Sequence, residues 1–270
     1  MLAEKHAALL ERLESLGSVL VAYSGGVDST LLAVCAHAAL GERCKAVLAT
    51  SDTYPQSEVV GARDLAAELG LTLLEVETYE LADPRFAENT PERCYWCKGE
   101  LFGLLARVAE VHGLAYVADG NNADDLSDHR PGHRAAVELG VVSPLQDVGM
   151  TKAEIRQLAR ELGLPNWDKP SAACLASRVP YGTPITVELL ARIEQAEARL
   201  RQLGIRQLRV RHHGPLARIE VEPGDFDLLM SHRDAVVQHL RALGYTYVTL
   251  DLAGFRSGSL NQGLPGTDRA

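Results

Sequence analysis

The sequence predicts an α/β protein with a doubly wound parallel sheet, followed by a smaller α+β domain. Before Pro165, short apolar runs alternate with amphipathic helical stretches, and a glycine-rich turn follows the first apolar run. After the loop at 165–184 the pattern changes to polar and apolar alternation at 206–223. Strands that alternate with helices are typical of parallel sheets, whereas adjacent alternating strands favour a hairpin.

The first segment contains five apolar runs, each of strand length. Helical periodicity separates these runs, and Thr151 followed by Glu154 is a capping box that predicts a helix start. Strands are predicted at 18–23, 45–50, 71–78, 115–120 and 141–143, and helices at 1–17, 30–40, 57–70, 94–112 and 150–163.

The second segment reads differently. It begins with a long charged helix, continues with two strands around a His-Gly-Pro turn, and ends with a helix at 225–243, a strand at 246–252 and a frayed tail at 261–270. We therefore expect a first domain at 1–170 and a second domain at 171–270.

Bulk composition limits the classes of function. The 270 residues include 36 acidic and 27 basic side chains, a net charge of -9, which disfavours a nucleic-acid partner. No apolar run is long enough for a membrane span, and the N-terminal stretch lacks the apolar core of a signal peptide. The expected compartment is the cytoplasm.

The turn SGGVDS lies between a predicted strand and a predicted helix. Its members Ser24, Gly25, Gly26, Asp28 and Ser29 allow close backbone approach to an anion at a helix N-terminus. The alternative is a turn whose glycines serve only a positive φ. The hexapeptide matches neither the Walker loop nor the dinucleotide fingerprint. It resembles the signature of PP-loop ATP pyrophosphatases, which implies ATP and Mg²⁺ as ligands and AMP transfer to a substrate.

Two further strand ends are expected to border the nucleotide. In an open parallel sheet, ligands bind beyond the carboxyl ends of the strands. The tips Thr50 and Ser51, and then Gly120, Asn121 and Asp124, follow predicted strands. The DGNNADD stretch would approach the phosphates by resemblance to PP-loop enzymes; alternatively, it is an Asx-rich turn that opens a helix.

The cysteines are five in number, which argues against a disulfide framework. Cys94 and Cys97 form a CxxC pair that suits redox chemistry, a metal or a cluster. With Cys174 they would need a fourth ligand for structural zinc, whereas three thiolates suit a 4Fe-4S cluster with one open iron. Cys35 and Cys44 are expected to be small buried residues.

Four segments together resemble the LarE family, ATP-dependent sulfurtransferases of nickel-pincer-nucleotide biosynthesis. They are the SGGVDS turn and the stretches at 119–132, 167–182 and 251–261, which contain DGNNADDLSDHRPG, WDKPSAACLASRVPYG and DLAGFRSGSLN. The resemblance implies adenylylation of a carboxylate of pyridinium-3,5-biscarboxylic acid mononucleotide, followed by displacement of AMP by sulfur. In members with a single cysteine at the position of Cys174, that residue gives up its sulfur and becomes dehydroalanine.

The additional CYWC motif resembles the cluster-bearing branch of the family. This implies that Cys94, Cys97 and Cys174 hold a 4Fe-4S cluster, that Cys174 and Asp28 act in catalysis, and that the immediate sulfur donor is left open. The resemblance also implies a homo-oligomer, for example a hexamer built from dimers. The small-molecule nucleotide substrate would be bound by Trp96, Ser177, Arg178, Arg209, Arg211 and Arg256.

Alternatives remain for several of these residues. Each arginine could equally be a solvated surface residue, and Trp96 could serve packing. Glutamates 194, 197 and 220 could form a further metal site, but helix glutamates are usually solvated. Asn121 departs from the small hydroxyl residue expected there, which leaves the phosphate contacts open.

Three rival functions use some of the same features. A PP-loop tRNA thiolase with a three-cysteine cluster should carry a basic RNA-facing surface. An ammonia-using synthetase of the NAD or GMP type should carry a glutaminase domain or ammonia channel and no clustered cysteines. A nucleotide-binding regulator with structural zinc would bind ATP without releasing pyrophosphate.

Overall fold

A computed structural model describes residues 2–127, 131–256 and 260, with the side chains at 126 and 127 left out. The chain divides into two compact units. The first unit comprises Met1–Phe86 and Pro91–Ala172, and the second comprises Ala87–Thr90 and Ala173–Ala270. No helix among the described residues is long and apolar enough to cross a membrane.

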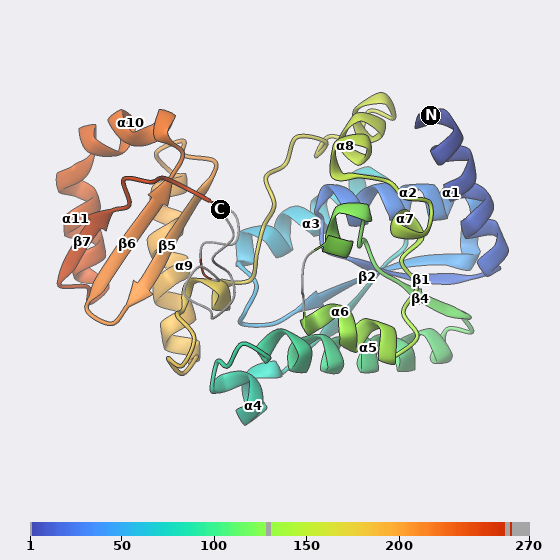
Figure 1. Ribbon diagram of the computed structural model, residues 1–270, viewed down its shortest axis with the longest axis horizontal. Coiled ribbons are helices and arrows are strands. Elements are labelled where there is room, and N and C mark those ends of the chain that lie inside the picture. The colour runs from blue at the N-terminus through green and yellow to red at the C-terminus, as the bar shows by residue number, and fades with distance from the viewer. Residues whose placement is uncertain (1, 128–130, 257–259, 261–270) are drawn as a thin grey trace. The chain divides into compact units, whose positions relative to one another are not determined.

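The first unit is built around a four-stranded parallel sheet in the order β3-β2-β1-β4 (Figure 1). This confirms the predicted parallel α/β class. The run at 141–143 makes only one bridge, between Ala118 and Val142, instead of the predicted strand. The strands are β1 Val19–Tyr23, β2 Cys44–Thr50, β3 Leu73–Glu77 and β4 Tyr116–Ala118.

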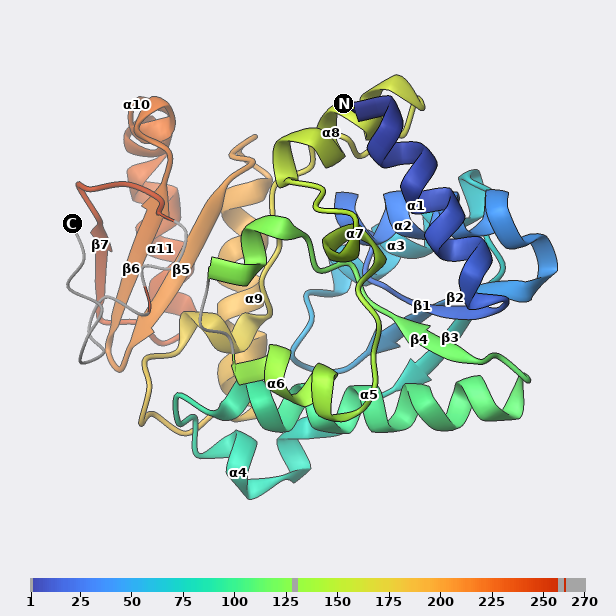
Figure 2. The same ribbon diagram turned by 45° about the vertical axis from the view of Figure 1, so that its right-hand side comes forward.

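Helices cover both faces of this sheet, as Figures 1 and 2 show. On one face, apolar side chains of α1, α2 and α8 pack with Val19 and Val21 of β1. On the other face, Leu101, Phe102 and Leu105 of α5 pack with Leu20 and Val47. The helices are α1 Leu2–Leu16, α2 Val27–Leu40, α3 Gln56–Glu68, α4 Pro84–Ala87, α5 Arg93–Val111, α6 Pro131–Glu138, α7 Pro144–Asp147 and α8 Lys152–Glu161.

The second unit contains a three-stranded sheet in the order β5-β6-β7, in which β5 is antiparallel and β7 parallel to β6. The helix predicted at 225–243 is in fact two helices. Ser231 Oγ donates to the carbonyl oxygen of Leu228 at 2.8 Å, and this local bond competes with continuation of the helix. The elements are α9 Val187–Arg201, β5 Leu208–His213, β6 Leu216–Val221, α10 Phe226–Ser231, α11 Arg233–Ala242 and β7 Tyr247–Leu250.

Strict alternation gives the β5-β6 hairpin two different faces. Val210 and Ile219 pair across the hairpin and belong to an apolar cluster with Leu200 of α9 and Leu240 of α11. The intervening positions carry charged side chains that are nevertheless buried, namely Arg209, Arg211 and Glu220.

The short segment Ala87–Thr90, which we call the strap, belongs to the second unit although its sequence neighbours belong to the first. Its Asn89 is fully buried and adopts a positive φ of 55°. The Asn89 amide nitrogen donates to the carbonyl oxygens of Pro180 at 2.8 Å and Thr183 at 2.9 Å, and the backbone oxygen of Asn89 accepts from Gly182 at 3.0 Å. The boundary predicted after residue 170 places this segment in the first domain instead.

Candidate functional site

The SGGVDS turn connects β1 to α2 in the first unit. Gly25 has φ +69°, and a Cβ atom there would lie 2.7 Å from the Cβ of Ala62. Gly26 caps α2 without a side-chain hydrogen bond. The turn is therefore held close to α3, and no side chain of the described residues caps the N-terminus of this 14-residue helix, the arrangement that attracts phosphate groups.

The end of β4 closes on the same helix N-terminus. A Cβ atom at Gly120 would lie 3.0 Å from the backbone nitrogen of Ser29. The hydroxyls of Ser24 and Ser29 lie 3.1 Å apart within the turn. The structure thus brings the predicted residues of the turn and of the DGNN stretch together at the carboxyl ends of β1 and β4, where the strand order reverses.

Asp28 forms an ion pair with Lys152, the first residue of α8. One carboxylate oxygen of Asp28, Oδ2, takes this cation, whereas the buried Oδ1 has no hydrogen-bond partner within the described part of the chain. The backbone nitrogen of Lys152 donates to Oδ2 of Asp124 at 2.9 Å. The group therefore combines one cation with two carboxylates, a composition suited to Mg²⁺ and phosphate oxygens.

Sequence reasoning missed Lys152 and a second cation, Lys169. The Lys169 ammonium lies 3.2 Å from the carbonyl oxygen of Gly25 and 2.9 Å from Glu58. Asn166 donates to the same Gly25 oxygen at 3.1 Å. One lysine directly follows the Thr151 cap and the other precedes Cys174, but no spacing rule links either of them to the turn.

Asn121 contacts Asp119. Its amide nitrogen donates to Asp119 Oδ2 at 2.6 Å, and its backbone nitrogen donates to Oδ1 at 3.1 Å. Ser143 donates to Oδ1 at 2.7 Å. Burial raises the pKa of Asp119 above its ordinary value. Asn121 thus shapes the β4 tip through Asp119.

Thr50 and Ser51 lie at the carboxyl end of β2 in the same unit. The Thr50 hydroxyl donates to the carbonyl oxygen of Val76 at 3.3 Å, and the Ser51 hydroxyl donates to the buried carboxylate of Glu80 at 2.7 Å. Glu80 Oε2 has no hydrogen-bond partner among the described residues. Both predicted residues therefore stabilise the tip of β2.

The cysteines fall into two classes. Cys35 and Cys44 are buried, and burial raises the pKa of each thiol to about 12, which keeps them unreactive. Cys94, in contrast, is exposed and Cys97 is half-buried in the first turns of α5, and Cys174 is half-buried in the second unit. Within the described ranges no group of three or more His, Cys, Asp or Glu side chains is arranged to hold a metal ion.

Trp96 lines an open cavity of about 630 Å³ in the first unit. The guanidinium of Arg85 lies 4.0 Å from the Trp96 ring centroid, and the Tyr95 ring stands edge-on at 4.9 Å. One cation already stacks on this ring, so a planar substrate would have to use the other face or displace Arg85.

Three of the four arginines predicted to bind substrate, namely Arg178, Arg209 and Arg211, are buried and are not the solvated residues of the alternative interpretation. Arg178 and Arg211 are 1% and 5% exposed, and each pairs with a buried glutamate, Glu197 at 2.8 Å and Glu220 at 2.9 Å. The expectation that these two glutamates are solvated is accordingly wrong, because both are buried and paired with arginines.

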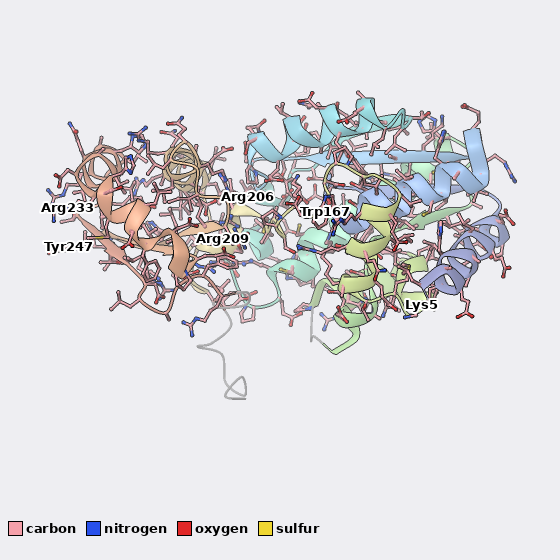
Figure 3. All side chains as sticks on the ribbon, turned by 90° about the horizontal axis from the view of Figure 1, so that it is seen from above. Lys5, Trp167, Arg206, Arg209, Arg233 and Tyr247 are labelled. Carbon is pink, nitrogen blue, oxygen red and sulfur yellow. The ribbon has the colours of Figure 1, made fainter. Side chains whose placement is uncertain are left out.

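Arg209, labelled in Figure 3, lies on β5 with its guanidinium 5.1 Å from the ring centroid of Phe255. Burial lowers the pKa of Arg209 to about 10, and the neighbouring positive charges of Arg178 and Arg211 add to the effect. The carboxylate of Glu197 opposes this shift, and a bound anion beside Arg209 would likewise stabilise its charged form. Arg256 is exposed, while 128–130 and 257–259 of the family motifs and the tail at 261–270 lie outside the described residues.

Known proteins are similar either to the N-terminal part of this chain or to nearly all of it. A family model described as NAD synthase matches residues 5–93, which include the SGGVDS turn and β1 to β3. The glutamine-hydrolyzing GMP synthase of Aeropyrum pernix is 31% identical over 67% of this chain and 38% of its own length. These likenesses cover part of the chain.

Two relatives match nearly the whole chain. An uncharacterized protein of Synechocystis is 44% identical over 98% of this chain and 99% of its own length. The pyridinium-3,5-bisthiocarboxylic acid mononucleotide synthase of Lactiplantibacillus plantarum is 40% identical over 97% of this chain and 96% of its own length. The predicted family and enzyme class are confirmed: the chain belongs to the LarE family of ATP-using PP-loop sulfurtransferases.

Proposed function

We propose that this enzyme converts pyridinium-3,5-biscarboxylic acid mononucleotide into the bisthiocarboxylic acid in two rounds of adenylylation and sulfur transfer. The full-length likeness to the synthase of Lactiplantibacillus plantarum carries the proposal. The first unit would bind ATP, and the second unit would supply Cys174 and most of the arginines that hold the anionic substrate.

The first step activates a carboxylate. A carboxylate oxygen attacks the α-phosphorus of ATP, the bond between that phosphorus and the bridging oxygen breaks, and pyrophosphate leaves. The uncapped N-terminus of α2, together with Lys152 and Lys169, would neutralise the departing pyrophosphate. Mg²⁺, when bound, would supply further charge neutralisation, and Asp28 Oδ1, which has no hydrogen-bond partner among the described residues, fits it as a ligand.

The second step exchanges oxygen for sulfur. A sulfur nucleophile attacks the carbonyl carbon of the acyl adenylate, the bond from that carbon to the phosphate oxygen breaks, and AMP leaves with the oxygen. If Cys174 is the donor, its Cβ–S bond then breaks with loss of the α proton and leaves dehydroalanine. If an inorganic sulfide is the donor, Cys174 survives the reaction.

A 4Fe-4S cluster on Cys94, Cys97 and Cys174 belongs to this proposal. The donor set fits, since these three thiols are the accessible ones, whereas Cys35 and Cys44 are buried. The strap ends at Thr90, four positions before Cys94, and its partner Val179 follows Cys174 by five positions. When bound, such a cluster would supply inorganic sulfur and spare Cys174.

Iron counting and a turnover assay test the proposal. The full chain is reconstituted anaerobically with iron and sulfide and then given ATP, Mg²⁺ and the pyridinium biscarboxylate. Four irons per chain with repeated thiocarboxylate formation are expected from the 4Fe-4S assignment. A single turnover that leaves dehydroalanine at position 174 would support the proposed reaction but contradict the proposed cluster. If the chain forms no thiocarboxylate at all, the proposed function is contradicted.

Cysteine variants then separate the ligands from the other thiols. Cys94→Ala, Cys97→Ala and Cys174→Ala should each lose the cluster absorption while pyrophosphate release stays measurable. Cys35→Ala, a buried position of the first unit, is the matched control and should keep the cluster. Retention of four irons by any two of the three ligand variants contradicts the assignment.

A further inference from the structure

Two buried guanidiniums bind the turn that carries Cys174: Arg211 donates to the carbonyl oxygen of Ser177 at 2.7 Å, and Arg178 contacts the backbone at Cys174 itself. Arg178 is 1% exposed, and its Nη1 donates to the carbonyl oxygens of Ala173 at 2.7 Å and Cys174 at 2.9 Å. The same nitrogen lies 3.0 Å from the hydroxyl of Ser177. One side of the guanidinium therefore binds the backbone at Ala173 and Cys174.

The other side of that guanidinium is fixed by Glu197 of α9, which is fully buried. Nε and Nη2 of Arg178 donate to the two oxygens of Glu197 at 2.8 and 2.9 Å, a bidentate pair. Glu197 also accepts from the backbone nitrogen of Val210 at 3.0 Å and from Arg201 at 2.9 Å. Although burial opposes ionisation, Arg178 and Arg201 hold the pKa of Glu197 below its usual range.

The backbone of Cys174 is constrained from several directions. Its carbonyl oxygen accepts from Arg178 Nη1, from the Ser177 backbone nitrogen at 3.0 Å and from the Ser177 hydroxyl at 2.8 Å. Leu175 directly after it is fully buried, whereas Ala173 before it is exposed. The Cys174 side chain itself is half-buried. A fixed backbone beneath a reachable sulfur limits where that sulfur can go.

From these contacts we propose that Glu197 is a positioning residue for the Cys174 sulfur, which it orients through Arg178 without touching substrate. This assigns Arg178 to the turn and leaves anion binding to other arginines. The inference rests on the proposed function only insofar as the Cys174 sulfur takes part in sulfur transfer or ligation. It predicts two separable effects of loosening the pair, one on the thiol and one on the coupling of the two steps.

The first test measures the thiol and needs no substrate. The full-length chain, treated with a chelator, is reacted with iodoacetamide, and alkylation is followed by peptide mass spectrometry. Glu197→Gln removes the charge that fixes Arg178, so we expect the Cys174 rate to rise by about tenfold, because the turn opens more often. Cys94 and Cys97, in the other unit, are internal references with unchanged rates.

The second test measures how much thiocarboxylate the enzyme forms for each pyrophosphate that it releases. In the reconstituted enzyme, Glu197→Gln should release pyrophosphate at the wild-type rate but form less thiocarboxylate per pyrophosphate, because the residues proposed to bind ATP lie in the first unit and Glu197 is not among those proposed to hold the substrate. Glu188→Gln, which removes an exposed carboxylate from the same helix, is the matched control and should change neither readout. Glu197→Asp, which keeps the charge and shortens the arm, should give an intermediate ratio.

Three results overturn the inference. An unchanged Cys174 alkylation rate in Glu197→Gln shows that the pair does not hold the turn. A faster rate with an unchanged product ratio shows that holding the turn does not position the sulfur. Global unfolding of both Glu197 variants by circular dichroism shows that the pair serves the whole unit. If the wild-type enzyme forms no thiocarboxylate, the proposed function fails, and the alkylation rates still decide whether Glu197 holds the turn.

Discussion

At the scale of single residues, Gly25 combines a backbone requirement with a steric one. Its φ of +69° already disfavours a side chain, and a Cβ atom would also meet the Cβ and Cα of Ala62 at 2.7 and 2.9 Å. Gly25→Ala should therefore lower the free energy of unfolding by more than the backbone term alone, with an additional overpacking cost of about 1–3 kcal/mol. ATP affinity, measured by calorimetry, should fall with it because the turn is displaced.

Gly17 allows the cost of placing a side chain at a positive φ to be measured without a steric clash. It has a similar φ of +74°, and no atom of the described part of the chain lies within 4 Å of a Cβ atom built there. Gly17→Ala should cost about 1–2 kcal/mol without affecting ATP binding. Equal losses in the two variants by denaturant unfolding would show that α3 moves aside and that the close approach has no consequence.

Lys152 is the second residue whose role can be measured directly. Lys152→Met removes the cation beside Asp28, and the loss of a charge-assisted contact to phosphate, about 1.5–3 kcal/mol, corresponds to roughly 10- to 100-fold slower pyrophosphate release.

Lys5 offers a control of similar side-chain exposure, 32% against 28% for Lys152. It is labelled in Figure 3 and pairs with Glu154 at 2.7 Å in the same unit. Lys5→Met should leave pyrophosphate release unchanged. Comparable slowing in both variants would assign the effect of Lys152 to general stability.

The sequence predicted the residues of the SGGVDS turn but not the ion pairs between distant positions. Turn chemistry is local, so six consecutive letters were enough to place Gly25 and Asp28 at a helix N-terminus. The pairs of Arg178 with Glu197 and of Lys152 with Asp28 join positions 19 and 124 apart in the chain. Such pairings depend on how helices and strands pack, which no local pattern encodes.

At the scale of elements, α8 begins with the predicted capping box, in which Thr151 and Glu154 bond reciprocally. Thr151→Ala removes the side-chain acceptor of the Glu154 backbone nitrogen and should lower the free energy of unfolding by about 1 kcal/mol. Gln56→Ala is the control, because α3 begins without a side-chain cap. A loss no larger than that of the control in urea unfolding would contradict a stabilising role for the cap.

The same helix start predicts a pH dependence. Bonds from Lys5 and Thr151 lower the pKa of Glu154 to about 2 from 4.5. Since the folded pKa is below the unfolded one, this stabilisation is complete above the unfolded value and is lost as pH falls from 4.5 towards 2. The stability difference between wild type and Lys5→Met should therefore shrink across that range, and a constant difference would contradict the linkage.

The elements themselves were largely predictable, because buried parallel strands and amphipathic helices have different periods. The exceptions have local causes. The helix at 225–243 divides where Ser231 bonds back to Leu228, and the run at 141–143 follows β4 for a single bridge only. No Pro or Gly marks the division at Ser231, and the apolar pair at 141–142 does not by itself distinguish a single bridge from a strand.

At the scale of the whole molecule, the resemblance to LarE proteins predicts a homo-oligomer. Exposed apolar side chains on the second unit, including Tyr247 at 60% and Leu252 at 83%, provide surface that assembly could cover. Light scattering on the full chain should give a multiple of 29.2 kDa that does not change on dilution through the micromolar range. A mass of 29.2 kDa would show that the chain works as a monomer.

The strap sets an order of events during synthesis. Asn89 leaves the ribosome 90 to 94 residues ahead of the carbonyl oxygens of Val179, Pro180 and Thr183 that it binds. At about 5–20 residues per second this corresponds to a delay of roughly 5–19 s. During this time the Asn89 amide lacks the carbonyl oxygens that it binds in the finished protein, while α5 with Cys94 and Cys97 is already being synthesised. In a nascent chain arrested before residue 179, the strap has none of these acceptors to bind. A protease that cleaves beside Asn89 should therefore cut the arrested chain faster than the finished protein.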